Sequence, residues 1–290
     1  MELESGCVRA NDLEFGYLTA GSGPLALCLH GFPDSAHTYR HLIVELASAG
    51  YRAVAPFMRG YAPTEIPADG LYQTGALVAD ANALHDALEG DADAVIVGHD
   101  WGAPAAYGAA VSRPDRWRRV VGMAVPPGGL VGASILGQYR QTKMSWYMFL
   151  FQHPLAETIV AKDDLAFLDH LWADWSPGFD ATDQLALLKP SLAEAVNLAA
   201  ALGYYRAVLG EGRKADMFAH LDVAARQVPP QPTLYLHGKS DGCIGVSVAH
   251  ATKEIVSSNV ATEIIEGTGH FLHLERPDVV NRRIVDFLSS

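Results

Sequence analysis

The sequence predicts an α/β fold in which a mostly parallel central sheet is flanked by helices and one helical segment is inserted into the chain. Three observations lead to this prediction. Short apolar runs alternate with helical patterns at both ends of the sequence, a long segment between them carries helical patterns without a clear strand, and no repeat or low-complexity tract occurs. Short apolar strands that alternate with helices indicate a parallel sheet covered on both faces.

The composition excludes several classes of protein. The chain has 290 residues, of which 49% are hydrophobic and 19% charged, as in an ordinary globular protein rather than a disordered or fibrous one. The formal net charge is −12 and no run of Lys or Arg occurs, whereas phosphate backbones and anionic membranes attract basic surfaces. We therefore expect neither a nucleic acid nor a membrane as a partner.

The first strands are expected on either side of a glycine-rich turn. Residues 13–28 form extended segments around the turn AGSGP at 20–24, because glycine and proline are residues that turns favour. The apolar run at 25–29 is typical of a buried strand. A loop at 30–35 follows it.

Helices and strands then alternate. Residues 41–49 have a helical pattern that ends at Gly50, and glycine favours a helix C-terminus. A short apolar strand is expected next, at 51–55. The period of the apolar residues then predicts a helix at 73–88, a strand at 94–97, a helix at 103–112 and a strand at 120–125.

The pattern changes after the sequence PPGG, which ends at Gly129. We interpret residues 129–228 as an inserted helical cap, because they contain many aromatic residues and no clear strand, and the sequence VPPQP follows. Residues 1–128 and 229–290 then form the core domain. The alternation resumes there with a strand at 233–236, a helix at 246–256, a strand at 261–265 and a helix at 277–288.

The sharpest local signal is the sequence GHDWG at 98–102, at the junction of an expected strand and an expected helix. Small residues on both sides allow the central residue of such a turn to adopt a strained conformation and to project above the sheet. This central residue is Asp100, where hydrolases of carboxylic esters usually carry serine. The pattern alone also fits an ordinary turn, so its meaning depends on residues that assist Asp100.

Two later loops supply such residues. A carboxylate nucleophile needs a base, and GTGHF places His270 after the last predicted strand. A base needs an orienting acid, and GKSDG places Asp241 after the strand before it. The order Asp100, Asp241, His270 matches the nucleophile, acid and base of the α/β-hydrolase fold. Each of the three follows a strand at its carboxyl end, where open sheets bind ligands.

The loop HGFP at 30–33 is the fourth part of the predicted site. In this fold the corresponding loop gives one main-chain N–H to the oxyanion hole, and the residue after the nucleophile gives the other. We assign these two donors to Phe32 and Trp101. We expect His30 to shape the loop by hydrogen bonding rather than to transfer a proton.

Five segments carry a resemblance to a known family: HGFPDS, MRGYAPTE, GHDWGAPAAYG, GKSDGCIG and GTGHFLHLERPDVV. With the inserted cap, they make nearly the whole chain similar to the epoxide hydrolases of the α/β-hydrolase superfamily. The resemblance implies two cap tyrosines that hold the epoxide oxygen, and Tyr147 and Tyr205 are at the matching positions. If the register is shifted by one turn, the nearest substitutes are Tyr139, Tyr204 and Trp146.

Both tyrosines also fit a purely structural role. Tyr205 shares a helical spacing with Leu198, Leu202 and Leu209, so the helix would bury it in any case. Tyr147 stands in an aromatic stretch that packing alone would explain.

The sequence departs from the family in the segment FMRGYA at 57–62. Asp and Gly are more usual there in place of Phe57 and Ala62. This loop transfers no proton, so the departure concerns the shape of the pocket rather than the chemistry.

An aspartate nucleophile selects alkyl transfer. Its attack on a tetrahedral carbon gives an alkyl ester, whereas attack on a carboxylic ester would give an unproductive anhydride. Water deprotonated by His270 then cleaves the ester, and Asp241 orients that base. We therefore expect an epoxide hydrolase that acts on a small-molecule epoxide without a cofactor or a metal, and in which Tyr147 and Tyr205 give the alkoxide its proton.

Haloalkane dehalogenase is the leading alternative, because it would use the same three residues. Those enzymes commonly take a second halide donor from an Asn at the position of Phe32 or from a cap tryptophan, and Phe32 has no side-chain donor. Fluoroacetate-type dehalogenases have an Arg at the position of Trp101. Other hydrolytic chemistry and a receptor that binds ligand without turnover stay open.

The three cysteines, Cys7, Cys28 and Cys243, are an odd number at wide spacing. This fits reduced thiols, buried as small apolar side chains, in a cytoplasmic protein. No apolar region resembles a signal peptide, and no stretch is apolar enough to span a membrane. We therefore expect a cytoplasmic protein, and the sequence leaves open whether its copies form a homo-oligomer.

Overall fold

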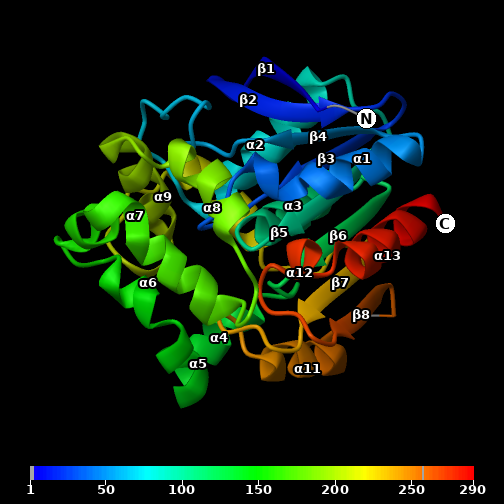
Figure 1. The fold of residues 1–290 in the computed structure, drawn as a ribbon. Helices are drawn as coiled ribbons and strands as arrows, with labels where there is room; N and C mark the ends of the chain where they lie inside the picture. The colour runs from blue at the N-terminus through cyan, green and yellow to red at the C-terminus, as the bar shows by residue number, and fades with distance from the viewer. Residues whose placement is uncertain (1–2, 257) are drawn as a thin grey trace.

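The computed structural model describes residues 3–256 and 258–290, and in them an eight-stranded sheet forms the centre of the molecule (Figure 1). The strands are β1 (Glu4–Ala10), β2 (Leu13–Ala20), β3 (Leu25–Leu29), β4 (Arg52–Pro56), β5 (Val95–His99), β6 (Arg119–Met123), β7 (Thr233–Gly238) and β8 (Val260–Ile265). Their order in the sheet is β1-β2-β4-β3-β5-β6-β7-β8. Strand β2 pairs antiparallel with β1 and β4, and the other described pairs are parallel. The predicted fold class is confirmed.

Two groups of helices cover the sheet. Helix α1 (Arg40–Ser48) packs with α13 (Pro277–Ser289), and α2 (Thr74–Ala87) packs with α3 (Gly102–Ser112). The connection through α1 runs from β3 toward one edge of the sheet, and the connection through α2 runs back toward the other edge. Because such crossovers are right-handed, α1 and α2 lie on opposite faces. Strands β3 and β5 are therefore buried on both sides, which explains their apolar sequences.

The point where these connections reverse direction is the expected position of a binding crevice. Strands β3 and β5 are neighbours, but the chain leaves β3 toward one edge of the sheet and leaves β5 toward the other. The loops after their carboxyl ends therefore diverge, and ligands of open α/β sheets bind between such loops. The loop at 30–35 and the turn at Asp100 both begin at this point.

The chain between β6 and β7 forms a helical insertion. Its described residues contain helices and no strand: α4 (Leu130–Gly137), α5 (Tyr139–Met144), α6 (Trp146–Leu150), α7 (Ala156–Trp175), α8 (Thr182–Leu188), α9 (Ala195–Leu209) and α10 (Ala219–Ala224). Figure 1 shows α5, α6, α7 and α9 together on one side of the sheet. Helix α10 instead packs against α2 and α3 of the core. The limits 129 and 228 for the cap stay a proposal.

Strand β1 is an element that sequence analysis did not predict. It pairs with β2 at the edge of the sheet, from Glu4 opposite Thr19 to Ala10 opposite Leu13. One of its faces is open to solvent, and Cys7 on this strand is exposed. The expectation that all three cysteines are buried is therefore wrong for Cys7, whereas the other two are buried.

Arg59 joins the core to the insertion. Its guanidinium donates to both carboxylate oxygens of Asp80 on α2, at 2.6 and 2.7 Å. Its carbonyl oxygen accepts the hydroxyl of Tyr204 on α9 at 2.9 Å, and Asn197 of the same helix donates to the carbonyl of Gly60 at 2.8 Å. The loop after β4 thus fixes the position of α9 above the sheet.

The two positions that depart from the family lie in this loop. Phe57 is buried and packs edge-on against His37, with the ring centroids 5.5 Å apart. The main-chain N–H of Ala62 donates to the carbonyl of Ser191 in the insertion at 3.1 Å. Both residues therefore contribute to packing, and neither reaches the reacting groups described below.

In the described part of the chain, no single helix is long and apolar enough to cross a membrane. The segment Thr182–Ser191 and helix α9 reach such a length and composition only as a pair, and this pair is bent by 100°.

Candidate active site

Asp100 occupies the tight turn between β5 and α3. Its φ is 51°, in the left-handed region that residues with a Cβ seldom adopt. A Cβ at Gly98 would lie 2.2 Å from the carbonyl oxygen of Gly102, and a Cβ at Gly102 would lie 1.9 Å from that of Leu29. Backbone contacts thus require the small residues that the sequence places on both sides of Asp100.

The carboxylate of Asp100 contacts the loop that follows β3. The main-chain N–H of Phe32 donates to Asp100 Oδ1 at 2.8 Å. Gly31 allows this approach, because a Cβ there would lie 2.2 Å from the same oxygen. Trp101 follows Asp100 directly, as the N-cap residue of α3. The Phe32 N–H therefore contacts the Asp100 carboxylate, and the roles of the Phe32 and Trp101 N–H groups in an oxyanion hole stay a proposal.

His30 holds this loop in place. Its Nε2 accepts the main-chain N–H of Met58 at 3.0 Å, so its Nδ1 carries the proton and donates to the carbonyl of Gly31 at 2.9 Å. Burial lowers the pKa of His30 to about 4, and the ring is neutral at neutral pH. His30 thus connects two loops, in line with the structural role expected from the sequence.

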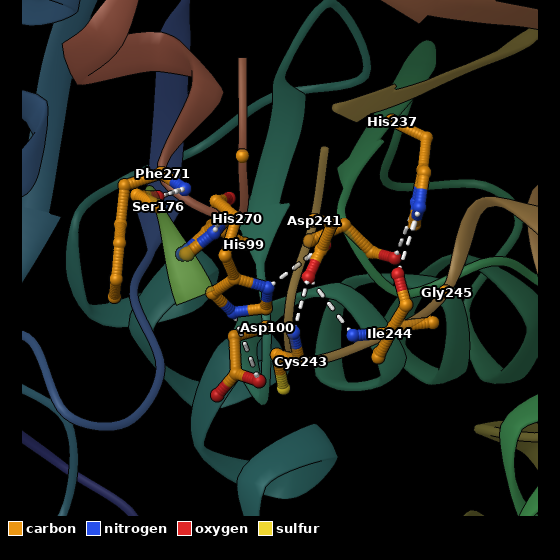
Figure 2. Close-up of polar contacts among 12 residues, drawn as sticks. His99, Asp100, Ser176, His237, Asp241, Cys243, Ile244, Gly245, His270 and Phe271 are labelled. Carbon is orange, nitrogen blue, oxygen red and sulfur yellow. Dashed lines mark hydrogen bonds and ion pairs between the residues drawn. The ribbon is translucent and has the colours of Figure 1, made fainter. Parts of the chain in front are cut away.

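His270 and Asp241 complete the group of side chains around Asp100 (Figure 2). His270 precedes α12 (Leu272–Glu275), and Asp241 lies between β7 and α11 (Val246–Ile255). His270 Nδ1 donates to Asp241 Oδ2 at 3.0 Å, and His270 Nε2 lies 3.6 Å from Asp100 Oδ2. The main-chain N–H groups of Cys243 and Ile244 donate to Asp241 Oδ1, both at 2.8 Å. Three loops far apart in sequence therefore meet at one site.

The charges of these groups depend on one another. Burial disfavours the imidazolium of His270, but the carboxylates of Asp241 and Asp100 outweigh burial and raise its pKa to about 10. Burial raises the pKa of the Asp241 carboxyl, but the positive charge of His270 outweighs burial and holds this pKa below its usual value. With Asp100 ionised, His270 is therefore an imidazolium at neutral pH.

Further residues that sequence analysis did not identify hold the loop of His270. The main-chain N–H of His270 donates to the carbonyl of Trp175, the last residue of α7, at 3.0 Å. His99 Nε2 donates to the carbonyl of His270 at 2.9 Å, and Gly269 donates its N–H to Glu275 at 2.7 Å. These contacts depend on main-chain atoms and on where α7 packs, so no local sequence pattern marks them.

A cavity of about 450 Å³ opens beside Asp100. Tyr147 and Tyr205 line it, with their ring centroids 5.6 Å apart in an edge-to-face arrangement. The Tyr205 hydroxyl lies beside the indole of Trp101, with the ring centroids 5.1 Å apart, and makes no hydrogen bond of ordinary geometry among the described residues. Much of the remaining wall is apolar and includes Val125, Val131, Ile135, Met148, Leu209 and Ile244. The site is thus suited to an apolar molecule with one polar centre near the carboxylate and the phenols.

The substitutes considered for these tyrosines do not line the cavity. Tyr139 and Trp146 are exposed, and the hydroxyl of Tyr204 donates to the carbonyl of Arg59. Tyr147 and Tyr205 are both buried, and both line the cavity. Each therefore packs in the protein interior and can also contact a ligand in the cavity.

Cys243 is a cavity residue that the sequence suggested only as a buried apolar side chain. Its Sγ lies 3.3 Å from the hydroxyl oxygen of Tyr147. Its place two residues after Asp241 is the signal that could have associated it with the site.

Two clusters of side chains are of a type that binds metal ions, with ligand atoms within 4.8 Å of one another. One contains Cys243 and two members of the group already described, whose imidazole and carboxylate bind each other. The other consists of Asp34, His99 and His273, and three of its atoms have no hydrogen-bond partner among the described residues. Imidazole and carboxylate suit a transition-metal ion, so this second cluster is where one would be held. The chemistry proposed below uses neither cluster as a metal site.

Comparison with known proteins agrees with this geometry. Residues 24–277 match the family described as "alpha/beta hydrolase fold". The chain is 32% identical to an epoxide hydrolase of Caballeronia sordidicola, over 98% of this chain and 93% of that protein. It is 28% identical to epoxide hydrolase A of Mycobacterium tuberculosis, over 98% and 96% of the two chains.

Solved structures give the same result. An epoxide hydrolase from metagenomes of hot environments superposes with a TM-score of 0.82 at 26% identity and covers 99% of each chain. One from an endophytic Streptomyces has a TM-score of 0.78 at 27% identity, over 99% of this chain and 95% of that one. The chain therefore belongs to the alpha/beta hydrolase fold family and, within it, to the family of the epoxide hydrolases.

Proposed function

We propose that the protein is an epoxide hydrolase that converts an epoxide to a vicinal diol through a covalent alkyl ester of Asp100. The observation that carries this proposal is a carboxylate at the nucleophile turn, in a cavity that two phenols also line. The relatives named epoxide hydrolase, similar over nearly the whole chain, support it. A carboxylate attacks a tetrahedral carbon and leaves an ester that water can cleave.

In the first step Asp100 attacks one epoxide carbon, and the bond from that carbon to the epoxide oxygen breaks. The electron pair stays on the oxygen, which needs a proton as charge develops. Burial raises the pKa of the Tyr147 and Tyr205 phenols, so both are protonated at neutral pH. A phenol gives its proton readily to an alkoxide, which is the stronger base.

The roles of the phenols can be tested by replacing each tyrosine with phenylalanine. Each change should raise the activation free energy of alkylation by about 1.5–3 kcal/mol, the contribution of one charge-assisted hydrogen bond. The double change should raise it far more than either single change. Ester hydrolysis should be nearly unchanged, because the phenols act before it. Single-turnover kinetics separate the two half-reactions. If both single variants alkylate at the parental rate, the two residues only pack the cap.

The ester changes the charge around His270. While Asp100 is ionised, two carboxylates favour the imidazolium, and once Asp100 is esterified one of these charges is lost. His270 can then give its proton to the phenolate left by the first step and become a neutral base. It deprotonates the water that attacks the ester carbonyl, whose oxyanion accepts the Phe32 N–H. One proton of that water leaves with the diol, and the other restores the imidazolium.

Oxygen labelling tests this route. In a single turnover in heavy-oxygen water, the diol should carry an unlabelled oxygen from Asp100, and the label should appear in the enzyme carboxylate. Label in the first-turnover diol would mean that water attacks the epoxide directly.

Haloalkane dehalogenase is the second candidate, and one observation favours it. Trp101 lines the cavity, and its indole N–H, which lies toward the Tyr205 hydroxyl, makes no hydrogen bond of ordinary geometry among the described residues. This N–H is therefore available to a departing halide. Bromide release from bromoalkanes, measured beside diol formation from epoxides of matched size, decides between the two activities.

The apolar wall of the cavity favours a small apolar epoxide as the substrate. A set of terminal, trans-disubstituted and bulky epoxides, read as diol product, would identify the preferred class. We propose a cytoplasmic location, supported by the three free cysteines. No nucleic acid, membrane or cofactor forms part of the proposal.

A further inference from the structure

The two cavity phenols have different surroundings. The hydroxyl oxygen of Tyr147 lies 3.3 Å from Cys243 Sγ, a hydrogen-bonding distance for sulfur. The group beside the hydroxyl of Tyr205 is instead the indole N–H of Trp101, which favours the phenolate and lowers the pKa of Tyr205 against the larger effect of burial, which raises it. Two phenols placed around one epoxide oxygen are therefore not equivalent as proton donors.

Cys243 is held rigidly next to the catalytic group. Its main-chain N–H donates to Asp241 Oδ1 at 2.8 Å, and its carbonyl accepts the amide of Gln141 on α5 at 2.9 Å. The same Gln141 accepts the N–H of Gly245 at 2.9 Å. Cys243 itself is 2% exposed. The main chain of Cys243 is thus fixed relative to Asp241 on one side and to the cap on the other, and this places the buried thiol beside Tyr147.

Burial and the nearby carboxylates raise the pKa of the Cys243 thiol, and burial together with Cys243 raises that of the Tyr147 phenol. Each group therefore carries a hydrogen, and only one hydrogen can lie between the two atoms. In the absence of substrate either atom can be the donor of the hydrogen between them. If the phenol O–H points to the substrate, the hydrogen between them belongs to sulfur.

We propose that Cys243 is a positioning residue whose S–H donates to the Tyr147 hydroxyl oxygen, and that it makes Tyr147 the phenol that gives up its proton. The proposal rests on the epoxide opening proposed above. The S–H turns the phenol O–H toward the epoxide oxygen. Tyr205 then donates a hydrogen bond to that oxygen and keeps its proton.

The proton count follows from the first half-reaction. The epoxide oxygen takes the Tyr147 proton as its bond to carbon breaks, and Tyr147 becomes a phenolate. The thiol donates to this phenolate, and a hydrogen bond to a charged acceptor is stronger than one to a neutral oxygen. The phenolate regains its proton from the His270 imidazolium. Cys243 stays a thiol throughout.

Three sets of variants test the proposal by single-turnover alkylation at saturating epoxide. Cys243→Ala should alkylate about threefold to tenfold more slowly, the range for loss of one weak to ordinary hydrogen bond. Cys243→Ser keeps a donor and should stay within about twofold of the parent. Ester hydrolysis should be unchanged in both. Cys28→Ala, which removes another buried thiol away from the cavity, is the matched control and should alkylate at the parental rate.

The decisive comparison crosses Cys243→Ala with each tyrosine variant. In Tyr147→Phe the cysteine change should have no further effect on alkylation, whereas in Tyr205→Phe it should slow alkylation by its full factor. Equal slowing in the two backgrounds would overturn the proposal, and so would a serine variant as slow as the alanine one. A faster Cys243→Ala enzyme would mean that Tyr147 donates to sulfur, which also overturns it.

The same measurements separate this inference from the proposed function. If the parent protein forms no covalent adduct, the proposed function fails and the inference fails with it. If the parent forms the adduct but Cys243→Ala and Tyr147→Phe act independently, only the role of Cys243 is contradicted.

Discussion

At the residue level, the protonation of His270 depends on the charge of its two carboxylate neighbours. Buried without them, the ring would be neutral, because burial alone lowers a histidine pKa. Asp241 and Asp100 reverse this and raise the pKa to about 10. His270 is protonated before alkylation, so it cannot deprotonate water at that stage. It becomes a neutral base only after Asp100 is esterified, and ester hydrolysis therefore follows alkylation.

The raised pKa of His270 predicts a pH dependence of stability. A histidine whose pKa rises on folding stabilises the native state fully below its unfolded value of about 6.5, and this contribution is lost as the pH rises through about 10. The free energy of unfolding of the parent should therefore fall over this range more steeply than that of His270→Gln, whose side chain has no such charge. Urea unfolding of both proteins at several pH values measures the difference. Equal slopes would show that His270 is not charged in the folded protein.

At the level of elements, the turn between β5 and α3 depends on backbone contact. A Cβ at Gly102 would lie 1.9 Å from the Leu29 carbonyl oxygen, and a carbonyl in a central strand cannot move aside. The turn thus ties the first turn of α3 to the neighbouring strand β3. The position of Asp100 is a consequence of this contact.

Gly102→Ala should destabilise the protein by about 3 kcal/mol or more, because the added methyl group overpacks rigid backbone. Gly137→Ala is the matched control. Gly137 ends α4, a Cβ there meets nothing within 4 Å, and its φ is not left-handed. The control should be neutral or stabilising by up to about 1 kcal/mol, the helix propensity difference. Urea unfolding compares the two, and similar losses would contradict the role given to the turn.

The elements could be predicted where one physical signal dominates. Each predicted core helix and strand lies within two residues of the observed one, since buried strands and amphipathic helices leave clear apolar periods. Strand β1 was missed because an edge strand has one solvated face and few apolar residues. The residue pair Asn11-Asp12 was a signal for this strand, because Asn and Asp are among the residues that accept the left-handed conformations of a two-residue hairpin turn. Both residues adopt that conformation in the structure, with φ of 44° and 62°.

The site could be predicted only in part. Asp100, Asp241 and His270 follow strands, and the topology of a parallel sheet alone brings strand ends together. The contact between Cys243 and Tyr147 depends instead on how α5 and α6 pack over the core. Apolar periodicity does not determine that packing, so the sequence did not reveal the contact.

At the level of the whole molecule, the insertion and the core share a buried charged junction. Arg59 and Asp80 are both nearly inaccessible and form a bidentate pair, while the carbonyl of Arg59 accepts the Tyr204 hydroxyl of α9. Tyr204 is next in sequence to Tyr205. The junction therefore also fixes the height of a cavity phenol above Asp100.

Arg59→Met should destabilise the protein by about 3–5 kcal/mol, because it leaves the buried Asp80 carboxylate without its charged partner, while the Asn11 amide still donates to one of its oxygens. It should also slow alkylation more than ester hydrolysis, since Tyr205 acts only in the first half-reaction. Arg276→Met is the control, because Arg276 pairs with Asp278 on the surface and its loss should cost no more than about 0.5 kcal/mol. Unfolding and single-turnover kinetics measure both effects. Equal stability losses would contradict this account of the junction.

The most direct test of the central claim is the intact mass of His270→Gln after mixing with an epoxide. With Asp100 in place and the base removed, alkylation should proceed and ester hydrolysis should stall. The protein should gain the mass of one substrate, located on the peptide that contains Asp100, and Asp100→Asn should gain none. A protein that stays unmodified and still forms diol would contradict the covalent mechanism.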